Sequence, residues 1–266
     1  MNKLYCLDFR RRCQGYLLAK RWKLLQKISR IIAPRRSVHS RGLHFTLPCN
    51  NWITHYRWKT FNTKEPETLD WIDNHIKEED VFFDVGANIG IYSVYAALRQ
   101  RKIQVIAFEP EYANLHLLRD NVVENNLRDR IKTYAVALSN RVGFSTLHIQ
   151  DLNPGAALST ESREDIVVTR ENCPVIWKEG ICTFTLDMFC QETGLQPNCM
   201  KLDVDGNEKE ILEGGIATVS SPHFRTLIFE LSDKKEIQDS CSKILGEAGL
   251  KRCYRSDQNR TEIWSR

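Results

Sequence analysis

Three acidic residues each close a short apolar run that is typical of a buried strand. Asp84 ends the run VFFD, Glu109 ends IQVIAFE, and Asp203 ends MKLD. In an open parallel sheet, ligands bind at the carboxyl ends of the strands, near the point where the winding direction reverses. We therefore expect Asp84, Glu109 and Asp203 to surround one crevice.

The turn after the first run is rich in glycine and reads D-x-G-x-N-x-G, from Asp84 through Gly86 and Asn88 to Gly90. A dinucleotide fingerprint requires glycine at its first, third and sixth positions, and here the third and sixth are Asn and Ile. Gly86 and Gly90 let the backbone pass close to a ligand, and Asn88 tolerates a left-handed conformation. The turn therefore predicts a nucleoside cofactor without a pyrophosphate.

The acid at the second strand end is spaced to hold a sugar. Glu109 stands 19 residues beyond Gly90, where an acid in such folds accepts hydrogen bonds from ribose hydroxyls. Its two carboxylate oxygens can accept from both hydroxyls at once. An acidic crevice of this kind also favours a ligand that carries positive charge.

Alternating strands and helices position these residues. We expect strands at 81–84, 103–108, 131–136, 199–202 and 226–230, helices at 67–76, 91–98, 115–122, 208–213 and 237–245, and two final strands at 250–254 and 262–264. The alternation predicts an α/β fold with a doubly wound, mostly parallel sheet, because each right-handed crossover returns the chain to the same edge.

The alternation breaks between residues 139 and 197. Strands are expected at 144–149 and 182–186, with a polar, turn-rich stretch at 153–164 between them. We interpret this segment as an insertion whose strands either extend the sheet edge or cover the site. Because binding residues concentrate on loops above a rigid scaffold, selectivity for the substrate is expected here.

Charge divides the chain into two parts. Residues 1–42 hold twelve Lys or Arg and one acid, whereas the rest of the chain holds 26 basic and 33 acidic side chains. Apolar residues recur at helical spacing between 17 and 32, which predicts a basic amphipathic helix that ends at Pro34. We predict an N-terminal extension at 1–42 and a single catalytic domain at 43–266.

Several roles fit the extension. Residues 17–36 could contact an anionic membrane surface, direct the protein to an organelle, contact nucleic acid, or pack on the domain without a ligand. No apolar run approaches the length of about 18 residues that a membrane-spanning helix needs. Nine scattered cysteines without a C-x-x-C pair indicate a reducing compartment. We expect a cytoplasmic protein, with membrane association and organellar targeting as alternatives.

Six segments together resemble the FkbM family of S-adenosylmethionine-dependent methyltransferases. In chain order they are VFFDVGANIGIYS, IAFEPEYANLHLLRDNVVEN, YAVALS, FTLDMF, KLDVDGNEKEILEGG and LIFEL, within residues 67–231. The resemblance implies a class I methyltransferase sheet of the Rossmann-like type and S-adenosyl-L-methionine as the cofactor. It also implies a hydroxyl acceptor on a sugar, glycan or natural product.

The resemblance further implies a cofactor site. Its members are Asp84, Gly86, Asn88, Gly90, Glu109, Pro110, Ala137 and Leu138. Glu109 would bind the ribose, residues 137–139 would form part of the adenine wall, and Asp84 would orient the amino-acid end. The family signature K-x-D-V-E-G usually has Glu where this chain has Asp205, which leaves the role of Asp205 open.

Transfer of a methyl group to a hydroxyl requires removal of a proton. We expect Asp203 to be the general base, with Lys201 and Glu230 beside it as further catalytic residues. His148 and His223 are alternative bases, because histidine titrates near neutral pH. Two acids at 203 and 205 could instead hold a divalent cation or cap the next helix, so the metal is unassigned.

Two other functions compete with O-methylation of a small acceptor. One is a nucleic-acid methyltransferase that binds RNA through the basic residues of segment 1–42. Its affinity for RNA should fall steeply as the salt concentration rises. The other is a binding protein of the same fold that has lost catalysis. It should bind the cofactor without turnover on any hydroxyl acceptor.

Overall fold

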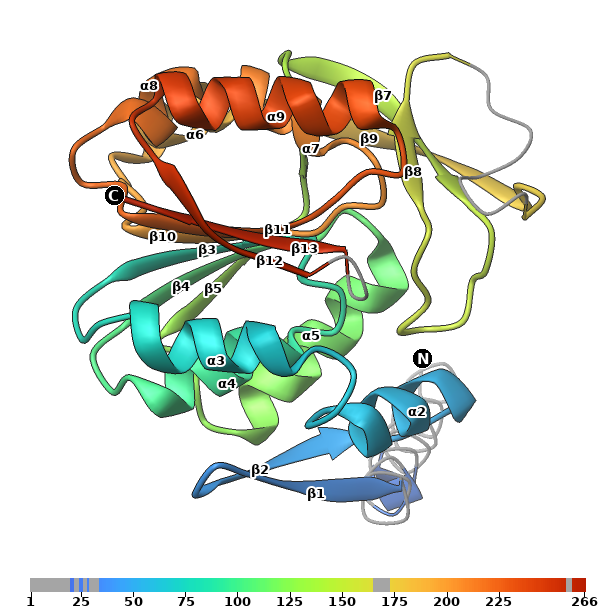
Figure 1. The fold of residues 1–266 in the computed structure, drawn as a ribbon. Coiled ribbons are helices and arrows are strands. Elements are labelled where there is room, and N and C mark those ends of the chain that lie inside the picture. The colour runs from blue at the N-terminus through green and yellow to red at the C-terminus, as the bar shows by residue number, and fades with distance from the viewer. Residues whose placement is uncertain (1–19, 22–23, 26–27, 29–33, 165–172, 257–259) are drawn as a thin grey trace, which may run out of the picture.

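The computed structural model describes residues 20–21, 24–25, 28, 34–164, 173–256 and 260–266. Most of the predicted amphipathic helix at 17–32 therefore lies outside the described residues. The body of the chain has three layers, a central sheet with helices on both faces (Figure 1). Within the described residues, no helix is both long and apolar enough to cross a membrane.

The central sheet has seven described strands in the order β12-β13-β11-β10-β3-β4-β5. Their bounds are β3 (Val81–Val85), β4 (Gln104–Phe108), β5 (Ile131–Tyr134), β10 (Cys199–Leu202), β11 (Thr226–Glu230), β12 (Lys251–Ser256) and β13 (Thr261–Ser265). The strands from β5 to β11 run parallel, and β13 pairs antiparallel with both β11 and β12. The predicted doubly wound, mostly parallel sheet is confirmed.

Two groups of helices cover the sheet (Figure 1). One face carries α3 (Pro66–His75), α4 (Ile91–Arg99) and α5 (Tyr112–Glu124), and the other carries α6 (Leu186–Thr193), α7 (Glu208–Glu213), α8 (Ile216–Ser220) and α9 (Lys235–Glu247). Because neighbouring strand residues point to opposite faces, Phe82 packs with Trp71 of α3 and Phe83 packs with Phe189 of α6. Each face of β3 thus contributes to its own core.

The winding of the chain leaves a switch point between β3 and β10. From β3 the chain moves outward to β4 and β5, and it later returns to place β10 on the other side of β3. The connections above these two strands therefore diverge, and a crevice forms at their carboxyl ends.

An N-terminal hairpin and a helix, neither of them predicted, precede the sheet. They are β1 (Arg35–Ser40), β2 (Leu43–Pro48) and α2 (Trp52–Thr60). Val38, Phe45 and Leu47 of the hairpin are buried in the same core as α4 and α5. The predicted boundary at residues 42 and 43 falls at the turn of this hairpin. The hairpin therefore joins the two predicted segments, and the division into extension and domain stays a prediction.

The predicted insertion at 139–197 forms most of a second sheet. Its strands are β6 (Ala137–Leu138), β7 (Gly143–Ile149), β8 (Thr160–Ser162) and β9 (Trp177–Phe184), in the order β6-β9-β7-β8. This sheet lies beside the central one instead of extending its edge (Figure 1). We call residues 153–159, which lie between β7 and β8, the strap.

Candidate active site

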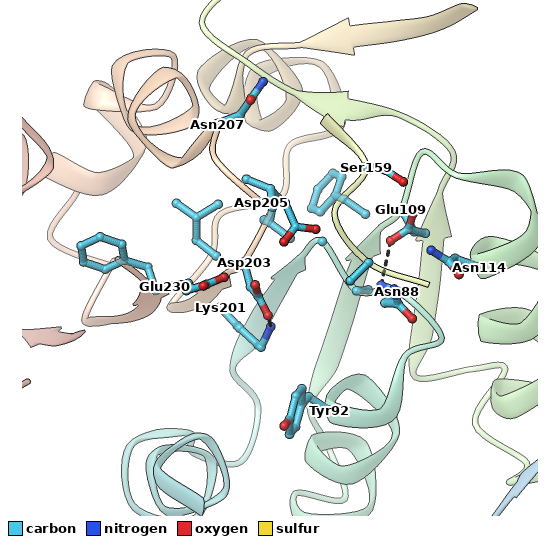
Figure 2. Close-up of a pocket in the computed structure, with 18 of the residues that line it drawn as sticks. Asn88, Tyr92, Glu109, Asn114, Ser159, Lys201, Asp203, Asp205, Asn207 and Glu230 are labelled. Carbon is cyan, nitrogen blue, oxygen red and sulfur yellow. Dashed lines mark hydrogen bonds and ion pairs between the residues drawn. The ribbon is translucent and has the colours of Figure 1, made fainter. Parts of the chain in front are cut away.

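A cavity of about 490 Å³ opens at the carboxyl ends of β3, β4 and β10. Figure 2 shows its polar side chains in two groups, with Asn88 and Glu109 on one side and Lys201, Asp203 and Glu230 on the other. The strap contributes part of the wall. The cavity thus lies at the strand ends where the sequence predicts the crevice.

The glycine turn approaches its neighbours too closely for larger residues. Gly86 has φ +77°, and a Cβ added there would lie 1.8 Å from the backbone oxygen of Asp203. Gly90 has φ +73°, and its added Cβ would lie 2.8 Å from Leu118. Asn88 has φ +51°, a left-handed conformation that asparagine tolerates. The backbone of the turn therefore forms this end of the cavity.

Glu109 is buried at the end of β4 and is held by the backbone. Its Oε2 accepts from the Asn88 N–H at 2.7 Å, and its Oε1 accepts from the Glu111 N–H at 3.0 Å. Burial raises the pKa of Glu109 to about 7, against the lowering effect of these hydrogen bonds. The Asn114 side chain also hydrogen-bonds with Glu109, so the carboxylate, which has about four lone-pair sites, keeps acceptor capacity for a ligand hydroxyl.

Asp84 lies behind the cavity wall and is only 1% exposed. Its Oδ2 accepts from the Ser93 hydroxyl at 2.5 Å, which ties β3 to the first turn of α4. Burial raises the pKa of Asp84, whereas the Lys201 charge lowers it. Its Oδ1 has no hydrogen-bond partner among the described residues. The structure thus gives Asp84 the role of orienting the turn, and its effect on the cofactor stays a prediction.

Apolar residues form the wall next to Glu109. Pro110, Ala137 and Leu138 all line the cavity, the last two from β6. The hydroxyl of Ser139 hydrogen-bonds to Glu161 at 3.3 Å, and Ser139 is not on the wall. A flat apolar ring can therefore lie against residues 110, 137 and 138.

Lys201 and Asp203 form an ion pair at the end of β10, with Nζ and Oδ2 2.7 Å apart. Lys201 is buried, whereas the Asp203 side chain is 34% exposed to the open cavity. Burial would raise the pKa of Asp203, but Lys201 and a hydrogen bond with Glu230 outweigh it and hold the pKa at about 2. The Asp203 carboxylate and the Lys201 ammonium, whose pKa is raised, both stay charged at neutral pH.

Tyr92 and Glu65 extend this charged group, and the sequence predicts neither. The Lys201 ammonium lies 5.2 Å from the centre of the Tyr92 ring. Burial and a hydrogen bond with Glu65 raise the pKa of Tyr92 well above its usual range. Tyr92 lies on α4 and Glu65 just before α3. Only the packing of these helices brings them to β10, so no local motif marks them.

The strap is fastened to both sides of the cavity. The Ala156 carbonyl accepts from the side-chain amides of Asn88, at 2.6 Å, and Asn114, at 3.2 Å. On the other side, the Leu158 N–H donates to Asp205 at 2.6 Å. Asp205 therefore holds the strap, a contact that could not be predicted from its place in the K-x-D-V-E-G signature.

The alternative bases do not lie on the cavity wall. His148 is buried in β7, and His223 is exposed before the amino end of β11. Among the described residues, no group of three or more His, Cys, Asp or Glu side chains is placed to hold a metal ion. The metal stays unassigned.

Fold and site together define a Rossmann-like α/β protein with a nucleoside-sized cavity at its switch point. The family model described as the methyltransferase FkbM domain matches residues 84–253, and the chain belongs to this family. The chain is 27% identical over 176 residues to the 31-O-demethyl-FK506 methyltransferase FkbM of Streptomyces tacrolimicus, covering 59% of this chain and 67% of the relative. It is 29% identical over 188 residues to the hexuronic acid methyltransferase AglP of Haloferax volcanii, covering 70% of each.

Two solved structures are similar to this chain at low identity. One is a precorrin-6y C5,15-methyltransferase from Geobacter metallireducens, with a TM-score of 0.46, 10% identity and coverage of 77% of this chain and 89% of the other. The second is a ribosomal protein L11 methylase from Lactobacillus delbrueckii subsp. bulgaricus, with a TM-score of 0.47, 10% identity and coverage of 76% and 78%.

Proposed function

We propose that this protein transfers a methyl group from S-adenosylmethionine to a hydroxyl group of a sugar, glycan or other natural product. The observation that carries the proposal is one cavity with Glu109 on one side and the Lys201–Asp203 pair on the other. The names of two relatives, a 31-O-demethyl-FK506 methyltransferase and a hexuronic acid methyltransferase, support an acceptor of this kind.

The cavity residues fit the proposed cofactor. Glu109 has acceptor capacity for a ribose hydroxyl, and the wall at residues 110, 137 and 138 suits an adenine ring. Gly86 lines the cavity and presents backbone to the ligand, whereas Gly90 packs against Leu118 and does not line the cavity. When bound, S-adenosylmethionine supplies a methyl carbon on a positively charged sulfur. The anionic Asp203 favours that charge.

Asp203 is the proposed general base. As a permanent carboxylate it accepts a hydrogen bond from the acceptor hydroxyl, aims the oxygen lone pair at the methyl carbon, and takes the proton as the C–O bond forms. A pKa of about 2 is sufficient, because a protonated ether is a far stronger acid than a carboxylic acid. Holding the reacting atoms in line can lower the barrier by roughly 7–11 kcal/mol.

Lys201 and Glu230 are proposed as positioning residues. Lys201 stays protonated, so it is no base at neutral pH, and its ion pair fixes the Asp203 carboxylate. Glu230 lines the cavity on the same side as Asp203 and is held in an ion pair by Arg260 at 2.6 Å. The Lys201 ion pair thus restrains the Asp203 carboxylate, and the Arg260 ion pair restrains its neighbour.

Asp203→Asn tests this mechanism. We expect the variant to bind S-adenosylhomocysteine with an affinity within about twofold of the parent, yet to lose roughly 10²–10⁴-fold in methyl transfer. Transfer is measured with labelled methyl donor against sugars, lipid-linked glycans and RNA, and binding by titration calorimetry. Thermal unfolding of the variant serves as the control for folding.

Each negative result contradicts a different part of the proposal. Unchanged turnover of Asp203→Asn would remove Asp203 from the mechanism. A parent protein that binds neither S-adenosylmethionine nor its demethylated product would contradict the proposed function itself. Cofactor binding without transfer to any acceptor would instead support an inactive binding protein, and transfer to RNA alone would support the nucleic-acid alternative.

A further inference from the structure

All but one of the cationic side chains in the described cavity wall form an ion pair with a carboxylate. These cations are Arg57, Lys64, Lys201 and Arg260. Three have a carboxylate partner: Lys64 with Glu65 at 2.9 Å, Lys201 with Asp203 at 2.7 Å, and Arg260 with Glu230 at 2.6 Å. Arg57 has no carboxylate within ion-pair distance in the described chain. A half-buried cation without a carboxylate partner is less well compensated than the other three, so an anionic ligand in the cavity would stabilise it.

The geometry of Arg57 leaves the binding edge of its guanidinium open. Arg57 lies on α2, and its Nε donates to the Gly155 carbonyl of the strap at 2.7 Å. Neither terminal nitrogen makes a hydrogen bond within the described residues. Nε thus anchors the plane of the group, while two parallel donors remain free. This fork matches the two oxygens of a carboxylate.

Arg57 lines the same cavity as the Lys201–Asp203 pair. Its partner Gly155 precedes Ala156, which Asn88 holds on the other side of the cavity. Arg57 also precedes residues 84–253, which match the family model. The open edge of the guanidinium is therefore part of the cavity wall and comes from a segment outside the family match.

We propose that the Arg57 guanidinium binds the carboxylate of a ligand in this cavity. The inference rests on the proposed function, in which two molecules can carry the group. One is S-adenosylmethionine, through its amino-acid end, and the other is an acidic sugar acceptor. Both present the same chemistry to the guanidinium, so the test must separate them.

The test compares Arg57→Gln with Lys59→Gln in the full chain. Lys59 is exposed on the same helix and does not line the cavity, so its substitution removes the same charge elsewhere. Titration calorimetry measures S-adenosylhomocysteine against 5′-methylthioadenosine, which keeps the nucleoside and sulfur but lacks the amino-acid end. Ligand-observed NMR measures glucuronate against glucose, which lacks the carboxylate.

The two sources give different results. If the cofactor carries the carboxylate, Arg57→Gln weakens S-adenosylhomocysteine roughly 10- to 100-fold and leaves 5′-methylthioadenosine within about twofold. If the acceptor carries it, Arg57→Gln leaves both nucleosides unchanged and weakens glucuronate but not glucose. Lys59→Gln changes none of the four in either case.

Three results would overturn the proposal. Arg57→Gln could match Lys59→Gln for all four ligands, or it could weaken the neutral ligands as much as the acidic ones, which indicates only a loosened strap. A parent protein that binds neither acid would also exclude the carboxylate site. By contrast, a parent that binds neither nucleoside contradicts the proposed methyl transfer, while the glucuronate comparison still tests Arg57.

Discussion

Two carboxylates of the cavity lie in opposite electrostatic environments. Glu109 is enclosed without a cationic partner and has a pKa of about 7. Asp203 pairs with Lys201 and has a pKa of about 2. Environments that separate the pKa values of neighbouring acids often separate their roles as well. Here the group that stays ionised faces the proposed acceptor, and the group that titrates faces the proposed ribose.

Cofactor affinity should therefore depend on pH through Glu109. Ribose hydroxyls need an ionised acceptor, and a carboxyl with a pKa of about 7 gains about tenfold in its ionised fraction between pH 6 and pH 8. We expect S-adenosylhomocysteine to bind up to about tenfold more tightly at pH 8 than at pH 6, as measured by calorimetry.

Glu109→Gln provides the control for this prediction. The variant should bind weakly at both pH values and lose the dependence, and a dependence that persists would assign it to another group. The effect on stability has the opposite sign. Because the folded pKa lies above the usual 4.5, Glu109 stabilises the fold fully below pH 4.5 and loses this contribution as the pH rises through 7.

Residues at strand ends could be predicted from the sequence, and residues on packed helices could not. The sequence predicts that Glu109 and Asp203 border one crevice, because apolar runs mark the strands and parallel strands end at one edge. Arg57, Glu65 and Tyr92 reach the cavity only through the packing of α2, α3 and α4 against the sheet. No spacing in the chain encodes that packing.

At the scale of elements, the glycine turn should be intolerant of substitution. In Gly86→Ala the new methyl group would overlap the backbone oxygen of Asp203 and the residue would keep φ near +77°. We expect a loss of at least about 2 kcal/mol in the free energy of unfolding and loss of S-adenosylhomocysteine binding. Urea denaturation and calorimetry measure the two effects.

Gly246→Ala is the matched control. Gly246 lies in α9, and a Cβ there would meet nothing within 4 Å. In a helix, alanine is favoured over glycine by up to about 1 kcal/mol, so this variant should be as stable as the parent or more so. Equal stability of both variants would contradict the steric argument at Gly86.

The elements that the sequence did not predict have weak or misleading local signals. In α2, Trp52 and Tyr56 are exposed whereas Trp58 packs against the core, so the aromatic residues do not by themselves mark the buried face. Helix α8 begins directly after Gly214 and Gly215, which follow the end of α7. It begins there because the Asp187 carboxylate accepts from the backbone N–H of Thr218 at 2.7 Å, a contact across 31 residues.

At the scale of the whole molecule, the hairpin should matter for folding and the residues before it should not matter for the cavity. A chain that starts at residue 34 should keep its affinity for S-adenosylhomocysteine, because no described residue before Arg57 lines the cavity. A chain that starts at residue 49 loses Val38, Phe45 and Leu47 from the core. At roughly 1.5–3 kcal/mol for each buried side chain, it should be several kcal/mol less stable.

Urea denaturation and calorimetry on the two truncated chains check this prediction. A loss of cofactor affinity in the chain that starts at 34 would show that the N-terminal residues take part in binding. Equal unfolding midpoints for the two chains would contradict the role of the hairpin in the core. The boundary between extension and domain would then lie after residue 48.

Hydrogen bonds fasten the strap to both sides of the proposed site. Asn88 belongs both to the turn that forms one end of the cavity and to the hydrogen bond that holds Ala156, and Asp205 follows the proposed base by two residues and holds Leu158. If the demethylated cofactor leaves beneath residues 153–159, both of these hydrogen bonds must break in every catalytic cycle. The release of demethylated cofactor would then limit the rate of turnover. Weakening either hydrogen bond would raise this rate and would also make binding of the methyl donor less efficient.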